Sequence, residues 1–596
     1  MYIDIVPNRK SPPAVLLRES YREGGRTVKR TLANLSMLPP EAVAALRAAL
    51  KGEHLVEAGS LFEVESSLPC GHVRAVRTAM SRLGMRDLVS SKPCPERDIV
   101  LAMIAQRIIE PGSKLETVSM FGDSTLAQEF GVQDVDENDL YAAMDWLAAS
   151  QPFIERKLAG RHLEEGATVL YDVSSSSYYG KQCPLAKRGY NRDGLRLPGI
   201  VYGLMTDTDG RPVAVRVYPG DTADPVTVPD QIDRLRGGFG IARFVFVGDR
   251  GMLTNTQIDR LRQQEGCGWI SCLRSSDIRR LLETRDPSGA PLFTQGNLAE
   301  IIHPDFPGER LVACYNPVLA MDRACVRGEL LESTEKELAR LRDHVGRRRK
   351  KPLTAAEIGV RAGRVINRYK VAKHFRLDIA DNHFGWERDT ESIAREAALD
   401  GIYVVRTSET PESLSAPDAV RAYKRLGDVE QAFRTFKGVD LLIRPIYHRL
   451  EDRVRAHVLL CMLAYYVEWH MRQALAPLLY ADEELEAARA SRDPVAKAQP
   501  SENLKRKRAR KRTQDGLRLR RWDGLLGALS TQVRNTCCFG EGRTAVRFTR
   551  DTMPKAFQLL EADHACWRNN KGVPMYAERE NGAGKRVECL PARVCA

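Results

Sequence analysis

The sequence predicts a mixed α/β protein of several domains, and three observations support this prediction. The chain has 596 residues, which is too many for one hydrophobic core, so about two to four domains are expected. Its 43% of apolar and 7% of aromatic residues are typical of a folded chain rather than a disordered one. Between residues 166 and 275, short apolar runs alternate with helical patterns, as expected for a sheet covered by helices.

The composition also narrows the class of partner and the compartment. Lys and Arg total 91 against 78 for Asp and Glu, a net charge of +13 that moderately favours nucleic acid as a partner. No apolar stretch of ~18 residues is free of charge, and residues 1–7 lack the pattern of a signal peptide, so we expect no membrane association. The thirteen cysteines form no Cys-x-x-Cys pair, which indicates reduced thiols in a cytoplasm rather than disulfides or structural zinc.

The first 56 residues predict a small basic unit. Extended segments at residues 14–17 and 26–32 precede a helix at residues 40–51. Its basic side chains are Arg18, Arg22, Arg26, Lys29 and Arg30. Either this unit binds DNA ends, or it is a solvated strand pair.

Residues 71–163 have a helical pattern. An apolar helix at residues 98–109 meets the stop signal Pro111-Gly112, and a second helix starts near Asn138. The helical region is either a DNA-binding domain or a packing layer for the core that follows.

Residues 166–275 predict the central sheet. Strands end at Asp172 and Asp249, and an Asp-Gly turn at residues 209–210 joins two strands between them. Three meandering strands, then helix, strand, helix and strand, is the order of an RNase H-like α/β core. In that order the first and fourth strands are neighbours, so Asp172 and Asp249 should lie side by side.

The next 140 or so residues are predicted to interrupt this core. A charged helix at residues 329–345 resembles a helical arm, and the basic run at residues 347–351 is either a solvated loop or a phosphate contact. A strand at residues 401–406 returns to the core, and helical patterns follow at residues 416–437 and 457–475. We expect the basic cluster within residues 483–516 to be a flexible arm, disordered without DNA, and the tail after about residue 558 to fray.

These patterns predict six parts of the chain. They are a small basic β-containing N-terminal domain (1–60), a helical, DNA-binding domain (61–163), the first part of the RNase H-like core (164–275), an insertion domain with a helical arm (276–399), the second part of the core (400–480) and a basic, partly flexible C-terminal region (481–596).

Three acids are the candidate catalytic residues: Asp172, Asp249 and Glu430. Hydrated divalent ions at a phosphodiester need hard oxygen ligands that converge from rigid elements, and strand ends and a helix supply that rigidity. Each acid alone could be a turn-former or a solvated side chain. Together they predict a phosphoryl-transfer site, in which the carboxylates repel one another until a cation binds.

The residues around Glu430 extend this prediction. On one continuous helix, Tyr423, Asp428, Glu430, Gln431 and Lys437 fall close to one stripe. That stripe would offer an acid for metal, and a hydroxyl and an amine for DNA phosphates. The alternative is an amphipathic helix with mixed surface charges. The serines at 174–177 lack a nucleophile elbow, and the chain has no phosphate-binding loop for ATP.

The segments Leu170-Tyr171-Asp172-Val173-Ser174-Ser175, Val247-Gly248-Asp249-Arg250-Gly251 and Tyr423 to Lys437 resemble the DDE transposases of bacterial insertion sequences. The most similar branch has a long insertion before the Glu and the signature Y-x-x-R-x-x-x-E-x-x-x-x-x-x-K around it. Tyr423, Glu430 and Lys437 match in place, whereas position 426 is Leu. The signature Arg is either Arg425, one residue early, or Arg434, one turn after the Glu.

The resemblance implies a function. Asp172, Asp249 and Glu430 would bind two Mg²⁺ ions, which Mn²⁺ could replace, to cut DNA at the element's ends and join those ends to target DNA. The expected DNA contacts are Tyr423, Arg425, Arg434, Lys437 and Arg250. The partners would be double-stranded DNA, as terminal inverted repeats and target, and a second copy of the chain in a synaptic homodimer. The location would be the bacterial cytoplasm, at the nucleoid when DNA is bound. The alternatives are a nuclease or resolvase without strand transfer, and a DNA-binding protein that has lost catalysis.

Overall fold

The computed structural model describes residues 1–575 except positions 10, 54–61, 284–292, 294–295, 349, 540–542, 550 and 552. The chain forms two compact units. The first comprises Met1–Leu68 and Gln532–Arg550, and the second comprises Pro69–Thr531 and Asp551–Ala596.

The first unit contains two small antiparallel sheets. One has the strand order β1-β2-β3 and the other β16-β15-β4. Their strands are β1 (Tyr2–Val6), β2 (Ala14–Glu23), β3 (Arg26–Asn34), β4 (Phe62–Pro69), β15 (Val533–Phe539) and β16 (Arg543–Phe548), and helix α1 (Pro40–Leu50) follows β3. The second sheet therefore pairs strands from opposite ends of the chain, which no local pattern of the sequence indicates.

The second unit begins with a layer of helices. They are α2 (Gly71–Arg82), α3 (Met85–Val89), α4 (Pro95–Ile109), α5 (Lys114–Phe121), α6 (Leu126–Phe130) and α7 (Glu137–His162). Helix α7 starts at a capping box, in which Asp136 accepts from the backbone N–H of Asp139 and the Asp139 side chain accepts from that of Asp136. Helices α4 and α7 pack against each other and against α16 (Glu451–Ala474), so this layer shares one core with the sheet.

An eight-stranded mixed sheet forms the centre of the second unit, in the order β10-β11-β14-β9-β8-β5-β6-β7. The strands are β5 (Ala167–Ser177), β6 (Gly199–Thr206), β7 (Pro212–Pro219), β8 (Phe244–Val247), β9 (Cys267–Cys272), β10 (Leu298–Ile301), β11 (Arg310–Tyr315) and β14 (Ile402–Thr407). Strands β5, β8 and β9 are parallel neighbours, and the other pairs are antiparallel. Helices α8 (Asp224–Asp233), with the π-turn Arg234–Gly238 after it, and α9 (Asn255–Arg262) connect the strands. This mixed α/β architecture is consistent with the predicted RNase H-like core.

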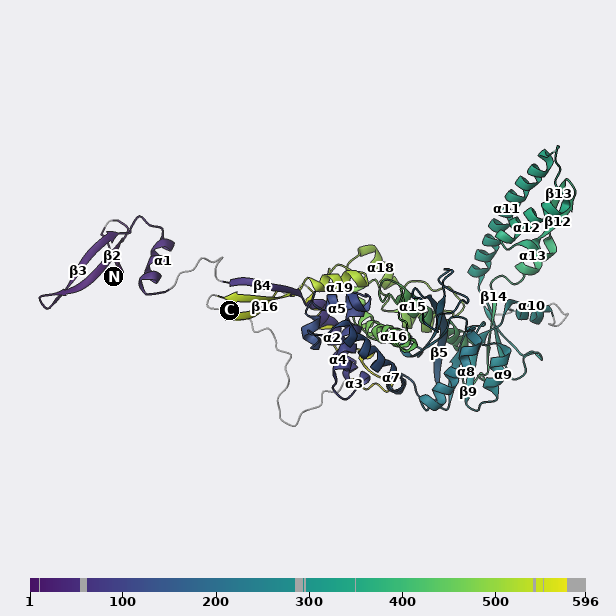
Figure 1. Ribbon diagram of the computed structural model, residues 1–596, viewed down its shortest axis with the longest axis horizontal. Coiled ribbons are helices and arrows are strands. Elements are labelled where there is room, and N and C mark those ends of the chain that lie inside the picture. Colours follow the sequence, from purple (N-terminus) through teal and green to yellow (C-terminus); the bar gives the residue numbers. More distant parts are fainter. Residues whose placement is uncertain are drawn as a thin grey trace. The chain divides into compact units, whose positions relative to one another are not determined.

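The segment between β9 and β14 does not lie wholly outside the sheet. Strands β10 and β11 extend the sheet beyond β14. Helix α10 (Ser275–Glu283) packs on these strands, because its Ile278 and Leu281 share a cluster with Leu311 and Val404. The other elements form a separate small core around Leu331, Leu338 and Ile358. They are α11 (Pro317–Arg347), α12 (Ala355–Arg368), the turn Ala372–His374, the hairpin β12 (Phe375–Ala380) and β13 (His383–Arg388), and α13 (Thr390–Ala397) (Figure 1).

The described elements of the second unit that follow β14 are helices and turns. They are α14 (Ala416–Lys424), α15 (Leu426–Lys437), α16, the turn Ala476–Leu478, α17 (Leu485–Ser491), α18 (Glu502–Arg510), α19 (Trp522–Ser530), α20 (Pro554–Glu561) and the turn Ala565–Trp567. None of the helices in the described part of the chain is long and apolar enough to span a membrane.

Two expectations for the C-terminal region need correction. The basic cluster is a docked helix rather than a disordered arm, because Leu504 and Lys507 of α18 are buried. The Lys507 amine donates to the carbonyl oxygens of Ala476 (3.1 Å) and Ala481 (3.3 Å) and pairs with Glu483. The chain does not fray directly after residue 558, because α20 continues to Glu561 and the turn Ala565–Trp567 follows it. Residues 576–596, on which the rest of this expectation falls, lie outside the described part.

Candidate active site

The parallel pairing of β5 and β8 determines where Asp172 and Asp249 lie. The last pair in register is Leu170 with Val247, and each acid stands two residues further along its chain. Because side chains alternate along a strand, Asp172 lies on the same face of β5 as Leu170. The two acids therefore come from adjacent strands, as the strand order predicted. The expectation that the first strand ends at Asp172 was wrong, because β5 continues to Ser177, whereas Asp249 does lie just beyond the end of β8.

Helix α15 brings Glu430 to the same region. It packs on β5, and the ring of Phe433 meets the ring of Tyr202 edge-on at 5.6 Å. Tyr202 pairs with Ser174 in the sheet, so α15 covers the face of β5 that carries Asp172. Asp172 and Glu430 line one cavity of about 540 Å³. Its other lining residues are Val173, Ser174, Arg192, Phe433, Arg434, Lys437, Gly438 and Arg444.

The three acids are electrostatically coupled. The pKa of Asp172 is raised to about 7, chiefly by burial; the charges of Asp249 and Glu430 add to the rise, whereas the backbone N–H of Val173 and the charge of Arg192 oppose it. Asp172 accepts that N–H at 2.7 Å. The charges of Asp249 and Glu430 therefore both act on Asp172.

Asp249 and Glu430 each have partners of their own in the structure. Asp249 accepts from the backbone N–H groups of Gly251 (2.9 Å) and Met252 (2.8 Å), and Glu430 pairs with Arg434 at 3.1 Å. The Glu430 side chain is 59% exposed. Among the residues that the structure describes, no group of three or more His, Cys, Asp or Glu side chains is arranged to hold one metal ion.

The DNA-contacting residues expected on the helix of Glu430 lie on two helices instead of one. The expected single helix breaks at Arg425, so Tyr423 belongs to α14 and Glu430 to α15. Burial raises the pKa of the Tyr423 hydroxyl, with Cys272 and Asp249 adding to the shift, so Tyr423 lies on the Asp249 side of the site. Arg425 makes two bonds to Glu486, at 3.1 and 2.5 Å, and is not among the residues lining the cavity.

The other expected DNA contacts are close to the acids. Arg434 and Lys437 line the cavity with Asp172 and Glu430. Arg250 follows Asp249 directly and is exposed. Of the two candidates for the signature Arg, Arg434 therefore shares the cavity, whereas Arg425 is occupied by α17.

Three residues that the sequence did not single out also belong to this site: Arg192, Asp193 and Arg444. The Asp193 carboxylate is only 2% exposed and pairs with Lys437 (3.2 Å) and Arg444 (2.6 Å). Burial alone raises the pKa of Asp193, but the Ser177 backbone N–H and the two cations outweigh it, so the net shift is downward. The Asn191-Arg192-Asp193-Gly194 turn was a visible signal of a loop, but it gave no indication of these partners.

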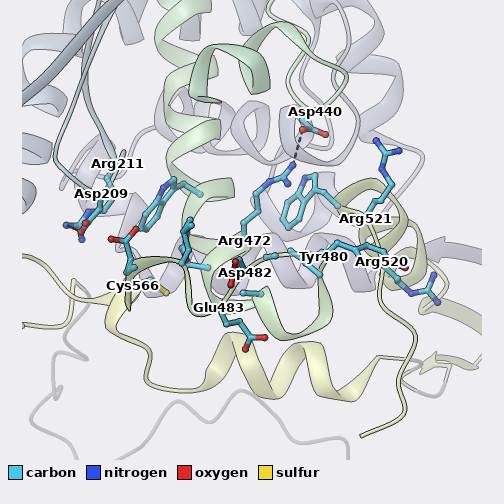
Figure 2. Close-up of a pocket in the computed structure, with 18 of the residues that line it drawn as sticks. Asp209, Arg211, Asp440, Arg472, Tyr480, Asp482, Glu483, Arg520, Arg521 and Cys566 are labelled. Carbon is cyan, nitrogen blue, oxygen red and sulfur yellow. Dashed lines mark hydrogen bonds and ion pairs between the residues drawn. The ribbon is translucent and has the colours of Figure 1, made fainter. Parts of the chain in front are cut away.

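A second cavity of about 720 Å³ lies between the end of α16, the following turn and α19 (Figure 2). It is lined by two tryptophans, Trp469 and Trp522, and by charged groups of both signs. Arg472 stacks on Trp522, with 4.7 Å to the ring centroid, and bonds to Asp440 at 2.9 Å (Figure 2). None of the three candidate acids lines it, so it is not the candidate active site.

Comparison with known protein families identifies the class of protein to which this chain belongs. Residues 166–467, slightly more than half of the chain, match the family model of the transposase DDE domain. Residues 3–59 match that of the N-terminal domain of IS1634 family transposases. The chain therefore belongs to the DDE transposases of insertion sequences, and the DDE domain supports a role as a DNA-cutting enzyme. No curated protein matches it.

Proposed function

We propose that this chain cuts DNA at the ends of an insertion element and joins those ends to target DNA, with Asp172, Asp249 and Glu430 as metal ligands. One observation carries the proposal. The β5–β8 register and the packing of α15 bring three acids from distant parts of the sequence within electrostatic range. A purely structural role would favour pairing the buried Asp172 with a cation rather than placing two further acids where their charges raise its pKa.

The residues fit divalent metal ions. Carboxylate oxygens are the hard donors that Mg²⁺ and Mn²⁺ prefer, and the raised pKa of Asp172 marks a negative charge that a cation would relieve. Glu430 is exposed on a helix and can turn from Arg434 toward the other two acids. Bound ions would activate the attacking hydroxyl and stabilise the leaving 3′-oxygen.

The chain's own side chains would prepare the phosphodiester. Arg434, Lys437 and Arg444 line the cavity and would hold the phosphate oxygens beside Asp172. In the first step, water attacks phosphorus, the bond to the 3′-oxygen breaks and a 3′-hydroxyl forms. In the second step, that hydroxyl attacks a target phosphorus and displaces another 3′-oxygen, so each bond broken is matched by one formed.

The basic surface of the chain supports DNA as the partner. The outer face of α18, defined here as Lys505, Arg506, Arg508 and Arg510, is exposed, as are Lys511 and Arg512 after it. Exposed cations at this density attract the phosphate backbone without reading its sequence. We further propose that two copies of the chain act together on two element ends.

The test uses the full-length protein, a duplex carrying the end of its own element, and a target plasmid. We expect cutting at the element boundary and joined products in Mg²⁺, and neither in EDTA. Cutting without joined products would support the nuclease alternative instead. Binding without cutting in Mg²⁺ and in Mn²⁺ would support a DNA-binding protein that has lost catalysis.

A further inference from the structure

The buried carboxylate of Asp193 connects three segments around the cavity. Its Oδ2 accepts from the backbone N–H (2.9 Å) and the hydroxyl (3.2 Å) of Ser177 at the end of β5. Its Oδ1 accepts from the Lys437 amine (3.2 Å) at the end of α15 and pairs with Arg444 (2.6 Å) in the connection to α16. One oxygen therefore faces the sheet and the other faces the two cations.

Both cations keep donors for another partner. A lysine amine has three N–H donors and a guanidinium has five, and Asp193 uses only part of them. The Lys437 side chain is 17% exposed and the Arg444 side chain 32%, and both line the cavity that holds Asp172 and Glu430. Their remaining donors can therefore reach an anion in this cavity.

The pairing also fixes two side chains that would otherwise be mobile. Lys and Arg lose much rotamer freedom when they are held in one geometry. Asp193 imposes that geometry before DNA arrives, so binding a phosphate need not order these side chains again. The other cavity cations are also paired: Arg192 with Asp224 at 2.6 Å, and Arg434 with Glu430.

We infer that Asp193 is a positioning residue, which holds Lys437 and Arg444 as a clamp for the DNA phosphate next to the cleaved bond. This inference rests on the proposed function and deepens it, because it adds Asp193 and Arg444 to the phosphate-holding residues. In the contrasting interpretation, Asp193 only fastens the β5–β6 loop through Ser177 and has no effect on DNA.

Binding experiments test the clamp without relying on cleavage. The probe is the element-end duplex in Ca²⁺, with or without one uncharged methylphosphonate at the phosphate next to the boundary. Wild type should bind the modified duplex at least about fivefold more weakly, because its clamp loses a charged partner. For Asp193→Asn and for Lys437→Ala, the affinity for the modified duplex should be less than about twofold below the affinity for the unmodified duplex. An equal penalty in wild type and both variants would overturn the inference.

Cleavage in Mg²⁺ gives the second readout. Asp193→Asn keeps the shape of the side chain but leaves one oxygen for two sets of donors, so the cleavage rate at saturating DNA should fall about 10- to 100-fold. The double variant Asp193→Asn/Lys437→Ala should cleave no more slowly than the worse single variant. If the fold-losses in cleavage rate of the two single variants multiply in the double variant, or if Asp193→Asn cleaves at the wild-type rate, the two residues do not act in one clamp.

Controls separate this role from folding and from the proposed function. Ser177→Ala removes the hydroxyl that donates to Asp193 and accepts from Asn191 but keeps the backbone N–H bond to Asp193, and Asp400→Asn removes a half-buried partner of Arg327 outside the cavity. Both should cleave like wild type. If Asp193→Asn fails to fold, then Arg444→Gln and Lys437→Met test the same clamp, and normal cleavage by both would overturn it. If wild type does not cleave but shows the methylphosphonate penalty, the proposed function fails while the clamp stands.

Discussion

The candidate active site and the outer face of α18 are both rich in cations, but they hold them differently. In the cavity beside β5, Arg192, Arg434, Lys437 and Arg444 each pair with a carboxylate. On α18, Arg506, Arg508 and Arg510 have no carboxylate within ion-pair distance among the residues that the structure describes. Within the first set, Arg192, Lys437 and Arg444 are half-buried and held in place, whereas Arg434 is 69% exposed and is as accessible as the arginines of α18.

This difference indicates that the two regions would bind DNA in two different ways. Fixed cations beside carboxylates can position one phosphate, and their effect depends on geometry more than on salt. Free cations on an exposed helix attract any phosphate, and salt weakens their effect steeply. Variants in the cavity should therefore change the rate of cleavage, and variants on α18 should change affinity.

The largest expected effect comes from the cavity. Asp172→Asn and Glu430→Gln each remove a proposed metal ligand, so the cleavage rate should fall at least about 1,000-fold. DNA affinity should stay within about threefold, because the free cations are untouched. Single-turnover cleavage and filter binding measure the two quantities. A variant that cleaves within tenfold of wild type would remove that residue from the site.

The pH dependence of protein stability tests whether Asp172 in the cavity has a raised pKa. In the metal-free protein the folded pKa of Asp172, about 7, lies above its usual value of 3.8. The folded state thus binds the proton more tightly, and this contribution to stability is lost as pH rises from about 4 to about 7. Asp172→Asn should therefore gain stability relative to wild type over that range, by at most about 4 kcal/mol.

Chemical denaturation of both proteins at several pH values measures this difference, and Mg²⁺ should shrink it at high pH. A difference that stays constant from acid to neutral pH would show that Asp172 carries no unusual charge cost.

The outer face of α18 gives a third expected effect. The triple variant Arg506→Gln/Arg508→Gln/Arg510→Gln should weaken DNA binding about 10-fold or more and lower the salt slope by about two to three. Cleavage at saturating DNA should not change. The matched control is Lys505→Gln, because Lys505 already pairs with Glu502 at 2.7 Å, so its removal should alter the slope less. An unchanged slope in the triple variant would mean that this face does not meet DNA.

The smallest effect distinguishes two neighbours on α18. Lys507→Met leaves the carbonyl groups of Ala476 and Ala481 without their buried donor, so stability should fall by about 2 kcal/mol. Arg508→Met should change stability by less than about 0.5 kcal/mol, because Arg508 is exposed. Thermal unfolding compares them, and equal stabilities would contradict the docking of α18 through Lys507.

The sequence predicted the parts of the site that local patterns encode. Apolar runs ending in Asp172 and Asp249, and the order of strands and helices between them, were enough to place these acids on adjacent strands, although β5 continues past Asp172 to Ser177. Strands β2 and β3 and helix α1 were also predicted from local patterns, whereas β1 and β4 were missed. The strands β10 and β11 were missed, because they are short and lie beside charged segments.

Long-range contacts explain the remaining differences. Asp193 and Lys437 are 244 residues apart, and no local pattern connects them. The basic composition of α18 suggested disorder, but burial of Leu504 and Lys507 on one side stabilises the helix. The break at Arg425 has no proline to mark it, and only the packing of α14 on β9 and of α15 on β5 separates Tyr423 from the helix of Glu430.

Replacement of one proposed ligand by a thiol tests the metal site most directly. Asp249→Cys exchanges a hard oxygen donor for a softer sulfur, which binds Mn²⁺ better than Mg²⁺. With the element-end duplex, we predict that this variant is inactive in Mg²⁺ and regains cleavage in Mn²⁺, whereas Asp249→Ala is inactive in both. Wild-type rates for Asp249→Cys in Mg²⁺, or cleavage by wild type without a divalent ion, would contradict a metal site built on Asp172, Asp249 and Glu430.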